Sequence, residues 1–281
     1  MSTLELMSIS KDIRQYLDEE RINRKLTFIE DTHEYGIFDP ITESVVNHFP
    51  SVSSLIKEYS IPFDDIIKSL QMCNEDEVRA AELRKTWQAK GDYANNVGSY
   101  VHYKLENYIL ELFDIDKKTR KPEYVLDNKS IIEGQRMVKT GINLMHTIIE
   151  KGFVPLDTEV IMGSTTMKYF GQCDNLWLGF MNNTIVFLMT DHKTNQSKNF
   201  KVRPWNVPML KPFSYLMDTD LSKYFLQQPL YALLLEDMLK DSPFSNYKFA
   251  GFRVIHLRDD GQLYKIPKQV YTDIKNIYWK N

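Results

Sequence analysis

The chain has 281 residues, of which 43% are hydrophobic and 26% are charged, and its formal net charge is −3. These ordinary values fit a folded globular protein with one large α/β domain or two small ones. We find no low-complexity tract, no internal repeat and no apolar run of the roughly 18 residues that a membrane span needs. The negative net charge argues mildly against a nucleic-acid partner, although the local distribution of charge matters more than its sum.

Cys73 and Cys173 are the two cysteines of the chain. They lie far apart and fit no metal, redox or disulfide pattern, so we expect an intracellular, reducing setting. Two thiolates also cannot supply the four ligands of an iron–sulfur cluster. Residues 1–12 lack a basic start followed by an apolar block, and they therefore do not read as a signal peptide.

Apolar spacing predicts mainly helices in the first half of the chain. The expected elements are a helix over 4–20, a β-hairpin over 25–38 with its turn near 31–33, a helix beginning at the serines after Pro50, a mainly helical stretch over 75–112, and a helix over 128–151. Gly91 and Gly98 interrupt the 75–112 stretch, and Gly152 ends the 128–151 helix, as glycine commonly does.

The second half of the chain alternates like a sheet with covering helices. Strands are predicted over 153–162, 169–179, 184–190, 247–257 and 263–266, and helices over 218–240 and 268–279. Asn182 and Asn183 are typical turn residues, whereas Pro229 indicates either the first turn of its helix or a kink. We therefore expect an α/β fold with helices against a mixed central sheet. Residues 1–125 would form the N-terminal hairpin and helical region, 126–281 the core, and both together one compact domain.

The most informative residues are two aspartates and a lysine on neighbouring predicted strands. Asp174 lies early in one strand, Asp191 ends the next, and Lys193 follows two residues later. If the strands pair as a hairpin, both carboxylates lie at one end of the sheet. Alternate residues of an extended chain point to the same side, so Asp191 and Lys193 would face one space. The competing interpretation is a surface Asp–Lys ion pair of little energetic consequence.

This grouping suits cleavage of a phosphodiester. A hard divalent cation prefers oxygen ligands and stabilises the extra negative charge, and Mg²⁺ usually takes one or two carboxylates. A water with a lowered pKa can attack the phosphorus, and a lysine can orient that water or stabilise the developing charge. His102 and Glu106 share a predicted helix face; the imidazole suits Mn²⁺ better than Mg²⁺, but a lone histidine is more often structural.

Polar and basic residues near this segment suggest nucleic-acid contacts. Gln227 and Tyr231 lie four apart on one helix face, where they could hold a phosphate or a base edge, unless Gln227 is simply exposed. Two basic clusters could neutralise phosphates. The first is Lys117, Lys118, Arg120 and Lys121, and the second is Lys193, Lys198, Lys201, Arg203 and Lys211. For the first cluster a solvated basic loop is an equal alternative.

The order of these motifs resembles the PD-(D/E)XK nuclease superfamily, in particular its RecB-like exonuclease branch of phage-type and mitochondrial genome-maintenance enzymes. The motifs are Gly98-x-x-x-His102, Glu159, Gly171-x-x-Asp174, Asp191-x-Lys193-Thr194 and Gln227-x-x-x-Tyr231. The Phe28 hairpin, the Ser51 helix start and the Trp87–Gly98 stretch are also similar to phage-type members. The resemblance extends over about residues 25–240. No single motif is specific, but five in this order with sensible spacing are a much stronger indication.

The resemblance implies a restriction-endonuclease-like core and a role for each matching residue. Asp174 and Asp191 would bind the metal with His102 and the His192 carbonyl, and Lys193 would be the catalytic lysine. Glu159 would be a supporting acid, and Gln227 and Tyr231 would contact DNA and steady the site. Independently of the resemblance, the positive charges of Lys198, Lys201 and Arg203 would bind the phosphates of the DNA. The cofactor would be Mg²⁺, for which Mn²⁺ substitutes. With too few cysteines for the iron–sulfur cluster of several relatives, the chain resembles the cluster-free members, and Cys173 stands where others have proline.

The sequence thus predicts a Mg²⁺-dependent DNA exonuclease acting on single strands or free ends in replication, recombination or repair. It has no helicase P-loop, and we expect it in the cytoplasm, or in the host cytoplasm if phage-encoded. A narrow channel roofed by the 75–125 helices would suit this activity. The alternatives are a structure-specific endonuclease with the same chemistry, a DNA-binding recombination partner that has lost catalysis, and an unrelated metal enzyme. The complete Asp174, Asp191 and Lys193 set argues against lost catalysis.

Overall fold

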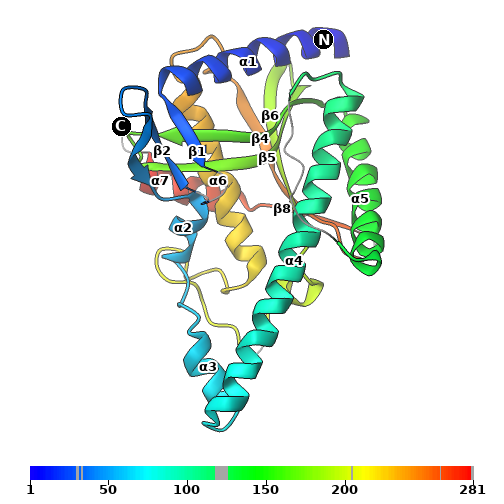
Figure 1. Cartoon of the computed structure of the whole chain (residues 1–281). Coiled ribbons are helices and arrows are strands. Elements are labelled where there is room, and N and C mark those ends of the chain that lie inside the picture. The colour runs from blue at the N-terminus through cyan, green and yellow to red at the C-terminus, as the bar shows by residue number, and fades with distance from the viewer. Residues whose placement is uncertain (30–31, 33, 118–125, 204, 260, 280–281) are drawn as a thin grey trace.

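The protein is built around a five-stranded mixed sheet with helices on both faces (Figure 1). The computed structural model describes residues 1–29, 32, 34–117, 126–203, 205–259 and 261–279. The strands follow one another in chain order: β4 (Val154–Ser164), β5 (Tyr169–Met181), β6 (Thr184–Lys193), β7 (Lys248–His256) and β8 (Gln262–Lys265). β6 and β7 pair in parallel, and the other neighbours pair antiparallel. The predicted α/β fold with a mixed central sheet is therefore confirmed.

A tight turn fixes the register of β5 against β6. Asn182 and Asn183 both have positive φ, at 50° and 59°, which is the conformation that a two-residue hairpin turn requires and that asparagine tolerates. The pairing then runs from Met181 opposite Thr184 to Asn175 opposite Thr190. The next pair in this register is Asp174 and Asp191, so the turn at one end of the hairpin sets which carboxylates meet at the other.

The N-terminal part contributes a helix and a second, smaller sheet. Helix α1 (Thr3–Asn23) precedes the three antiparallel strands β1 (Leu26–Ile29), β2 (Glu34–Asp39) and β3 (Ser44–Phe49). The predicted hairpin corresponds to β1 and β2, and its turn lies mostly outside the described residues. β3 was not predicted, because its residues are exposed or half-buried without a regular alternation and therefore carry no period-two signal.

The helices before the large sheet are α2 (Val52–Lys57), α3 (Asp65–Met72), α4 (Glu77–Leu112) and α5 (Asn128–Ile149). Ser51 caps α2 as predicted, because its hydroxyl accepts a hydrogen bond from the Ser54 amide (3.0 Å). α4 runs unbroken through Gly91 and Gly98, and its N-terminal end extends with α3 beyond the sheet (Figure 1). α3 was not predicted from the sequence. A sequence signal for it was Asp64, a typical N-cap residue whose side chain accepts a hydrogen bond from the Ile67 amide.

The remaining helices are the single turn η1 (Ser197–Phe200), α6 (Asp220–Leu239) and α7 (Lys268–Tyr278). The prediction that Pro229 occupies a first turn is wrong, because α6 begins at Asp220 with Thr219 as its cap and Pro229 lies buried in the interior. Proline there removes one backbone hydrogen bond, a loss that packing of the helix offsets. None of the helices in the described ranges is both long and apolar enough to cross a lipid bilayer.

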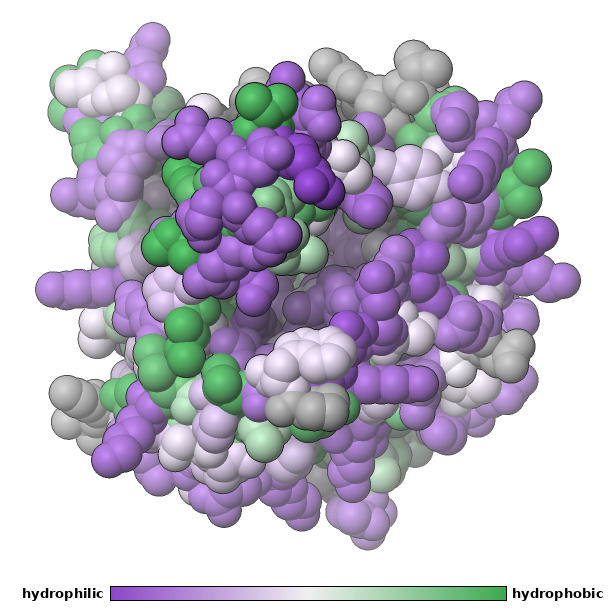
Figure 2. All heavy atoms as spheres, turned by 90° about the horizontal axis from the view of Figure 1, so that it is seen from below, coloured by the Kyte–Doolittle hydropathy of each residue, from purple (hydrophilic) through white to green (hydrophobic). Residues whose placement is uncertain are grey.

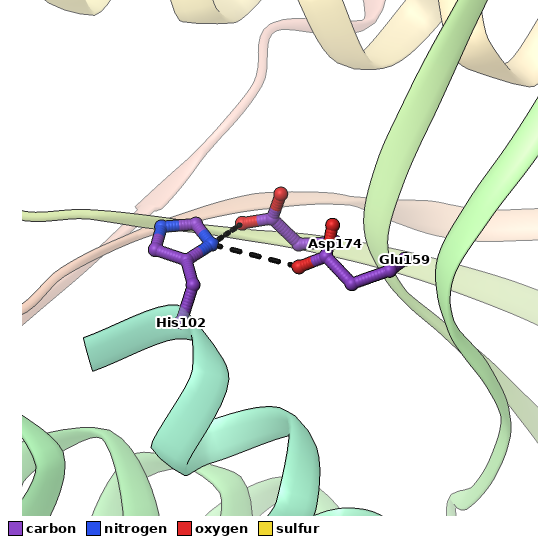
Figure 3. A group of neighbouring side chains, drawn as sticks. All are labelled: His102, Glu159 and Asp174. Carbon is purple, nitrogen blue, oxygen red and sulfur yellow. Dashed lines mark ion pairs between the residues drawn. The ribbon is translucent and has the colours of Figure 1, made fainter. Parts of the chain in front are cut away.

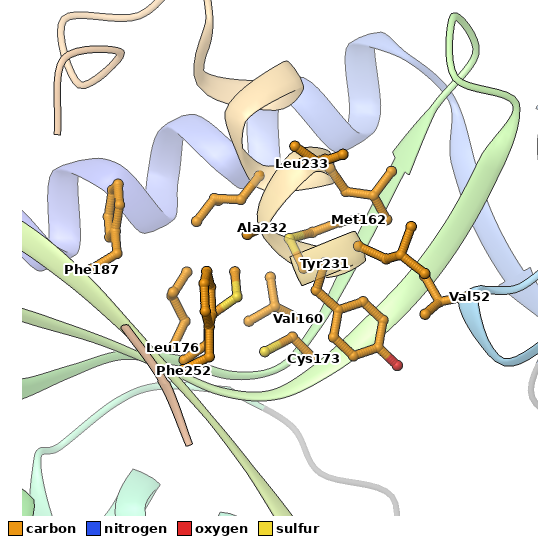
Figure 4. Close-up of a cluster of buried hydrophobic side chains, with 14 of the residues drawn as sticks. Val52, Val160, Met162, Cys173, Leu176, Phe187, Tyr231, Ala232, Leu233 and Phe252 are labelled. Carbon is orange, nitrogen blue, oxygen red and sulfur yellow. The ribbon is translucent and has the colours of Figure 1, made fainter. Parts of the chain in front are cut away.

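Two apolar clusters occupy the two faces of the large sheet. Leu176, Phe187 and Met189 belong to the cluster beneath α1, α6 and α7 (Figure 4). Their chain neighbours Trp177 and Leu188 belong instead to the cluster beneath α4 and α5. Alternate residues of a strand face opposite sides, so the central strands are apolar on both faces. The result is three layers, with the sheet between two layers of helices. Polar residues occupy the part of the sheet that lies between α4 and α6.

Two glycines allow these helices to approach the sheet closely. A Cβ atom on Gly171 of β5 would lie 2.4 Å from the Tyr231 ring of α6, and one on Gly98 of α4 would lie 3.1 Å from the Thr194 hydroxyl after β6. A Cβ atom at Gly171 would force the Tyr231 ring to shift, and one at Gly98 would require Thr194 to give way by a few tenths of an ångström. The glycines of two sequence motifs therefore set the distance between the helices and the ends of β5 and β6.

The Gly171 contact gives the first prediction. Replacing Gly171 with alanine forces Tyr231 to move, and overpacking of this kind costs about 1–3 kcal/mol. Gly91→Ala is the matched control, because nothing lies within 4 Å of the added carbon in the middle of α4 and alanine there stabilises a helix by about 0.5–1 kcal/mol. Urea unfolding of both variants should show opposite shifts. A Gly171→Ala variant as stable as the parent protein would contradict the close packing of α6.

Candidate functional site

Three side chains from separate elements converge at the polar edge of the sheet (Figure 3). His102 Nδ1 lies 3.5 Å from Asp174 Oδ2 and 3.7 Å from Glu159 Oε1. One nitrogen or oxygen from each residue lies within 4.8 Å of the other two, which is a spacing that could hold a metal ion. All three side chains are partly open to solvent, with exposed fractions of 28%, 25% and 12% for His102, Glu159 and Asp174. An ion could therefore enter.

The strand register places Glu159 beside Asp174. Thr158 pairs with Asn175 and Val160 with Cys173, so Glu159 and Asp174 are cross-strand neighbours between β4 and β5. Glu159 also has φ of +47°, although it lies inside a strand. A non-glycine residue in this left-handed region costs about 1–3 kcal/mol, and such residues cluster at functional sites. The strain thus coincides with the residue that completes the group.

His102 links this group to β6. Its Nε2 atom lies 3.0 Å from the backbone carbonyl of His192, which leaves Nδ1 facing the carboxylates. Burial alone would lower the pKa of His102, but the negative charges of Asp174 and Glu159 outweigh it and raise the pKa to about 9. The imidazole therefore carries a proton at neutral pH when no cation competes for the carboxylates.

Asp191 and Lys193 form an ion pair next to this group. Asp191 Oδ2 lies 2.7 Å from Lys193 Nζ, and the aspartate side chain is only 1% exposed. Burial and the neighbouring charge of Asp174 raise the pKa of Asp191 to about 7. For Lys193 burial acts to lower the pKa, but Asp191 and Asp174 outweigh it, so the pKa is raised and the ammonium remains charged. The three predicted residues therefore share one environment.

The oxygen atoms at this edge fit a divalent cation. Asp191 Oδ1 is buried and has no hydrogen-bond partner among the described residues, although an unpaired buried carboxylate oxygen is costly. Burial and Glu159 raise the pKa of Asp174, whose Oδ2 accepts a hydrogen bond from the His192 amide at 2.8 Å. Carboxylate and carbonyl oxygens are ligands for hard cations. A cation here would neutralise charge that the protein leaves uncompensated.

Helix α6 brings a second set of polar residues to the same edge. Gln227 Nε2 donates to the Tyr231 hydroxyl (2.8 Å), and Gln227 Oε1 is buried without a partner in the described ranges. Burial first, and then Asp191 and Asp174, raise the pKa of Tyr231 well above its ordinary value. Gln227 is therefore not simply exposed. It is packed toward the carboxylates with one acceptor atom unused.

Tyr224 is a site residue that the sequence analysis did not single out. Its ring lies under Lys193, with Nζ 4.4 Å from the centroid, and its hydroxyl donates to Asn195 Oδ1 at 2.8 Å. Cation–π contact of this kind fixes the direction of a buried ammonium. The signal was available, because Tyr224, Gln227 and Tyr231 recur at the spacing of one helix face.

The second basic cluster divides between the site and a neighbouring cleft. Lys198, Lys201 and Arg203 line a cleft of about 750 Å³, whereas Lys193 belongs to the carboxylate group and Lys211 lines neither. Of the first cluster, Lys118, Arg120 and Lys121 lie outside the described residues. Lys117 is paired with Asp157 (2.9 Å) and donates to the Thr158 carbonyl. It is thus bound inside the protein rather than free to neutralise phosphates.

The structure brings together every residue that the sequence placed at the metal or the catalytic position. One arrangement differs from the expectation: Glu159, expected as a supporting acid, lies directly in the group with His102 and Asp174, whereas Asp191 is engaged by Lys193. Glu106 lies nearby, where burial and Glu159 raise its pKa to about 7. No protein-family model matches the chain, and no curated protein sequence matches it significantly.

The raised pKa values predict how cation binding depends on pH. Asp191 is neutral below about pH 7 and His102 is protonated up to about pH 9, and both protons oppose a cation. We expect the Mg²⁺-dependent increase in melting temperature, measured against chelator at each pH, to grow from pH 6 to pH 8.5. Asp174→Asn should remove the increase at every pH. An increase that is constant across this range would contradict the linkage.

Proposed function

We propose that this protein is a metal-dependent DNA exonuclease of the PD-(D/E)XK type, similar to the RecB-like branch. The observation that supports it most is the convergence of Glu159, Asp174 and His102 beside the Asp191–Lys193 ion pair at one end of a strand hairpin. The PD-(D/E)XK pattern takes its name from this combination of acids and a lysine. The five motifs of the resemblance come from five different elements: α4, β4, β5, β6 and α6.

The donor set suits Mg²⁺, with Mn²⁺ as a substitute. Asp174, Asp191, His102 and the His192 carbonyl would hold the ion, and Glu159, grouped with His102 and Asp174, would assist. When bound, the cation neutralises phosphate charge and acidifies a water that can attack phosphorus. The imidazole would favour Mn²⁺ as a substitute, because Mn²⁺ binds nitrogen better than Mg²⁺ does. In its unprotonated form, His102 would offer Nδ1 as that nitrogen ligand.

Lys193 would supply positive charge to the phosphate as its negative charge increases. Its raised pKa keeps the ammonium protonated, so it is suited to stabilising charge rather than to accepting a proton. Tyr224 holds the ammonium from below and Asp191 from the side. A charge that is already oriented needs no rearrangement during the reaction. Gln227 and Tyr231, which are hydrogen-bonded to each other, would steady the site next to the DNA strand.

Loss of one metal ligand tests the chemistry. Asp191→Asn should abolish Mg²⁺-dependent cleavage of end-labelled DNA, because it removes a full charge with little change in size. Circular dichroism and melting temperature should show that the fold remains. Asp12→Asn, at an exposed position of α1, is the matched control and should cleave normally. Full activity of Asp191→Asn would remove this residue from the site.

A role of Lys193 in the chemical step can be distinguished from a role in DNA binding. Lys193→Ala should lower kcat about 10²–10³-fold, which is the effect of removing one preorganised charge-stabilising donor, while DNA affinity in chelator changes little. Lys11→Ala on the exposed face of α1 serves as the control. A selective loss of affinity with kcat retained would assign Lys193 to phosphate binding instead.

The need for a DNA end is tested by substrate topology. An exonuclease should degrade linear single-stranded DNA in Mg²⁺ and leave a covalently closed circle intact over the same time. Cutting of the closed circle would favour the structure-specific endonuclease with the same chemistry. Binding of DNA with no hydrolysis in either Mg²⁺ or Mn²⁺ would favour a recombination partner that has lost catalysis.

A further inference from the structure

The cleft next to the carboxylate group combines exposed aromatic rings with cations. Its walls include Phe63, which precedes α3, Trp87 of α4, and Trp205 together with Arg203 from the segment before α6. Figure 2 shows the face from below, where hydrophilic side chains surround a hollow. Phe63 and Trp205 are each 70% exposed. Large exposed rings cost free energy in water, so two on one cleft indicate a ligand that covers them.

The three rings of the cleft form one cation–π pair and one ring–ring pair. Arg203 lies over the Trp205 ring, with its guanidinium carbon 5.3 Å from the ring centroid. Phe63 and Trp87 have ring centroids 5.8 Å apart with their planes at 58°, so they support each other in a tilted contact. Phe63 and Trp87 come from the region of α3 and α4, whereas Arg203 and Trp205 come from the segment before α6, and all four line the cleft. A flat ligand entering the cleft would therefore meet ring surface contributed by two separate segments of the chain.

The positive charges of the cleft are free to act on a ligand. Lys198, Lys201 and Arg203 form no ion pair with any carboxylate in the described ranges. The two acids of the cleft are already engaged: Asp218 pairs with Lys223 (3.1 Å), and Asp220 accepts from Asn195 (3.0 Å). The remaining charge is therefore positive and favours an anion.

A continuous helix face connects this cleft to the carboxylate group. Asp220 lines the cleft, and Tyr224, Gln227 and Tyr231 follow it on α6 at spacings of four, three and four residues. They lie on one face of the helix. Seven residues from Asp220 to Gln227 rise about 10 Å at 1.5 Å each. That is about three nucleotides at 3.4 Å per stacked base.

We propose that Phe63, Trp87 and Trp205 form a platform on which the unpaired bases of a DNA strand stack, while Lys198, Lys201 and Arg203 bind its phosphates. The proposal rests on the proposed nuclease function and defines its substrate as an unpaired strand that reaches the carboxylate group along α6. Aromatic platforms combined with a basic groove are how proteins hold single strands without reading their sequence. In a duplex the bases face each other and cannot stack on these rings.

The experiment measures binding of fluorescent oligothymidylate in chelator, where no hydrolysis takes place. Trp205→Ala and Phe63→Ala should each weaken binding ~5- to 100-fold, as loss of one base-stacking contact does. Trp205→Phe should restore most of the affinity, because it keeps an aromatic face. Phe38→Ala removes a partly exposed ring outside the cleft and should bind like the parent protein. Unchanged affinity of both Trp205→Ala and Phe63→Ala would overturn the proposal.

An abasic oligonucleotide of the same length separates bases from phosphates. The parent protein should bind it more weakly, and Trp205→Ala should cause no further loss. Lys201→Ala should weaken both strands alike and reduce the salt dependence of binding by about 0.7 in the log–log slope, which is the value for one phosphate of a single strand. Two results would overturn stacking. One is a loss of affinity in Trp205→Ala that is as large for the abasic strand as for oligothymidylate. The other is an equally large loss of affinity of Trp205→Ala for blunt duplex DNA.

The two proposals can fail separately. If Trp205→Ala shows the expected base-dependent loss in chelator but the parent protein hydrolyses no DNA in Mg²⁺ or Mn²⁺, the platform stands and the nuclease assignment falls. If Mg²⁺-dependent hydrolysis depends on Asp191 but base-dependent binding does not depend on Phe63 or Trp205, the nuclease assignment stands and the platform falls. Quenching of tryptophan fluorescence on oligothymidylate binding, which should be reduced in Trp205→Ala, gives a second readout.

Discussion

Negative charge concentrated in a poorly solvated space is the constraint on which the site depends. Glu159, Asp174 and Asp191 lie side by side on the three adjoining strands β4, β5 and β6, and burial together with their mutual repulsion raises the pKa of both aspartates. Such an arrangement is unfavourable by itself. The protonated His102 and the ammonium of Lys193 offset part of this negative charge. Asp191 Oδ1, which is buried without a hydrogen-bond partner among the described residues, carries charge that is not offset. A divalent cation would remove the repulsion.

The fold holds these charges together through close helix-to-sheet packing. Gly98 lets α4 approach the end of β6, and Gly171 lets Tyr231 of α6 lie against β5. The apolar layers on both faces of the sheet fix the two helices, so the polar edge between them cannot relax by moving apart. The left-handed backbone at Glu159 is a local cost that this packing tolerates.

The neighbouring cleft has the opposite charge and extends the site in one direction. Its free cations and exposed rings lie near the N-terminal end of α6. The carboxylate group lies further along the same face of that helix. A strand that is attracted by the cations and held by the rings would bring its phosphates to a cation at the carboxylates. The overall net charge of −3 hides this separation, since the acids and the bases that matter occupy different parts of one surface.

The sequence by itself determined what depends on short-range geometry. The paired asparagines fix the β5–β6 register, and the two-residue alternation of a strand puts Lys193 on the same side as Asp191, so the Asp174, Asp191 and Lys193 group followed from local spacing. The helical period likewise placed Gln227 and Tyr231 on one face. The α/β class followed from the order of helices and strands.

Only the tertiary structure decided which distant residues join that group. His102 reaches it because α4 packs on the sheet, and Glu159 joins it through cross-strand pairing with a strained backbone that no pattern announces. Lys117 is paired internally with Asp157, Pro229 is accommodated inside α6, and Phe63 meets Trp87 across a helix pair. These contacts depend on the loops and on the close packing of whole layers, which many residues determine together. Local spacing carries no record of them.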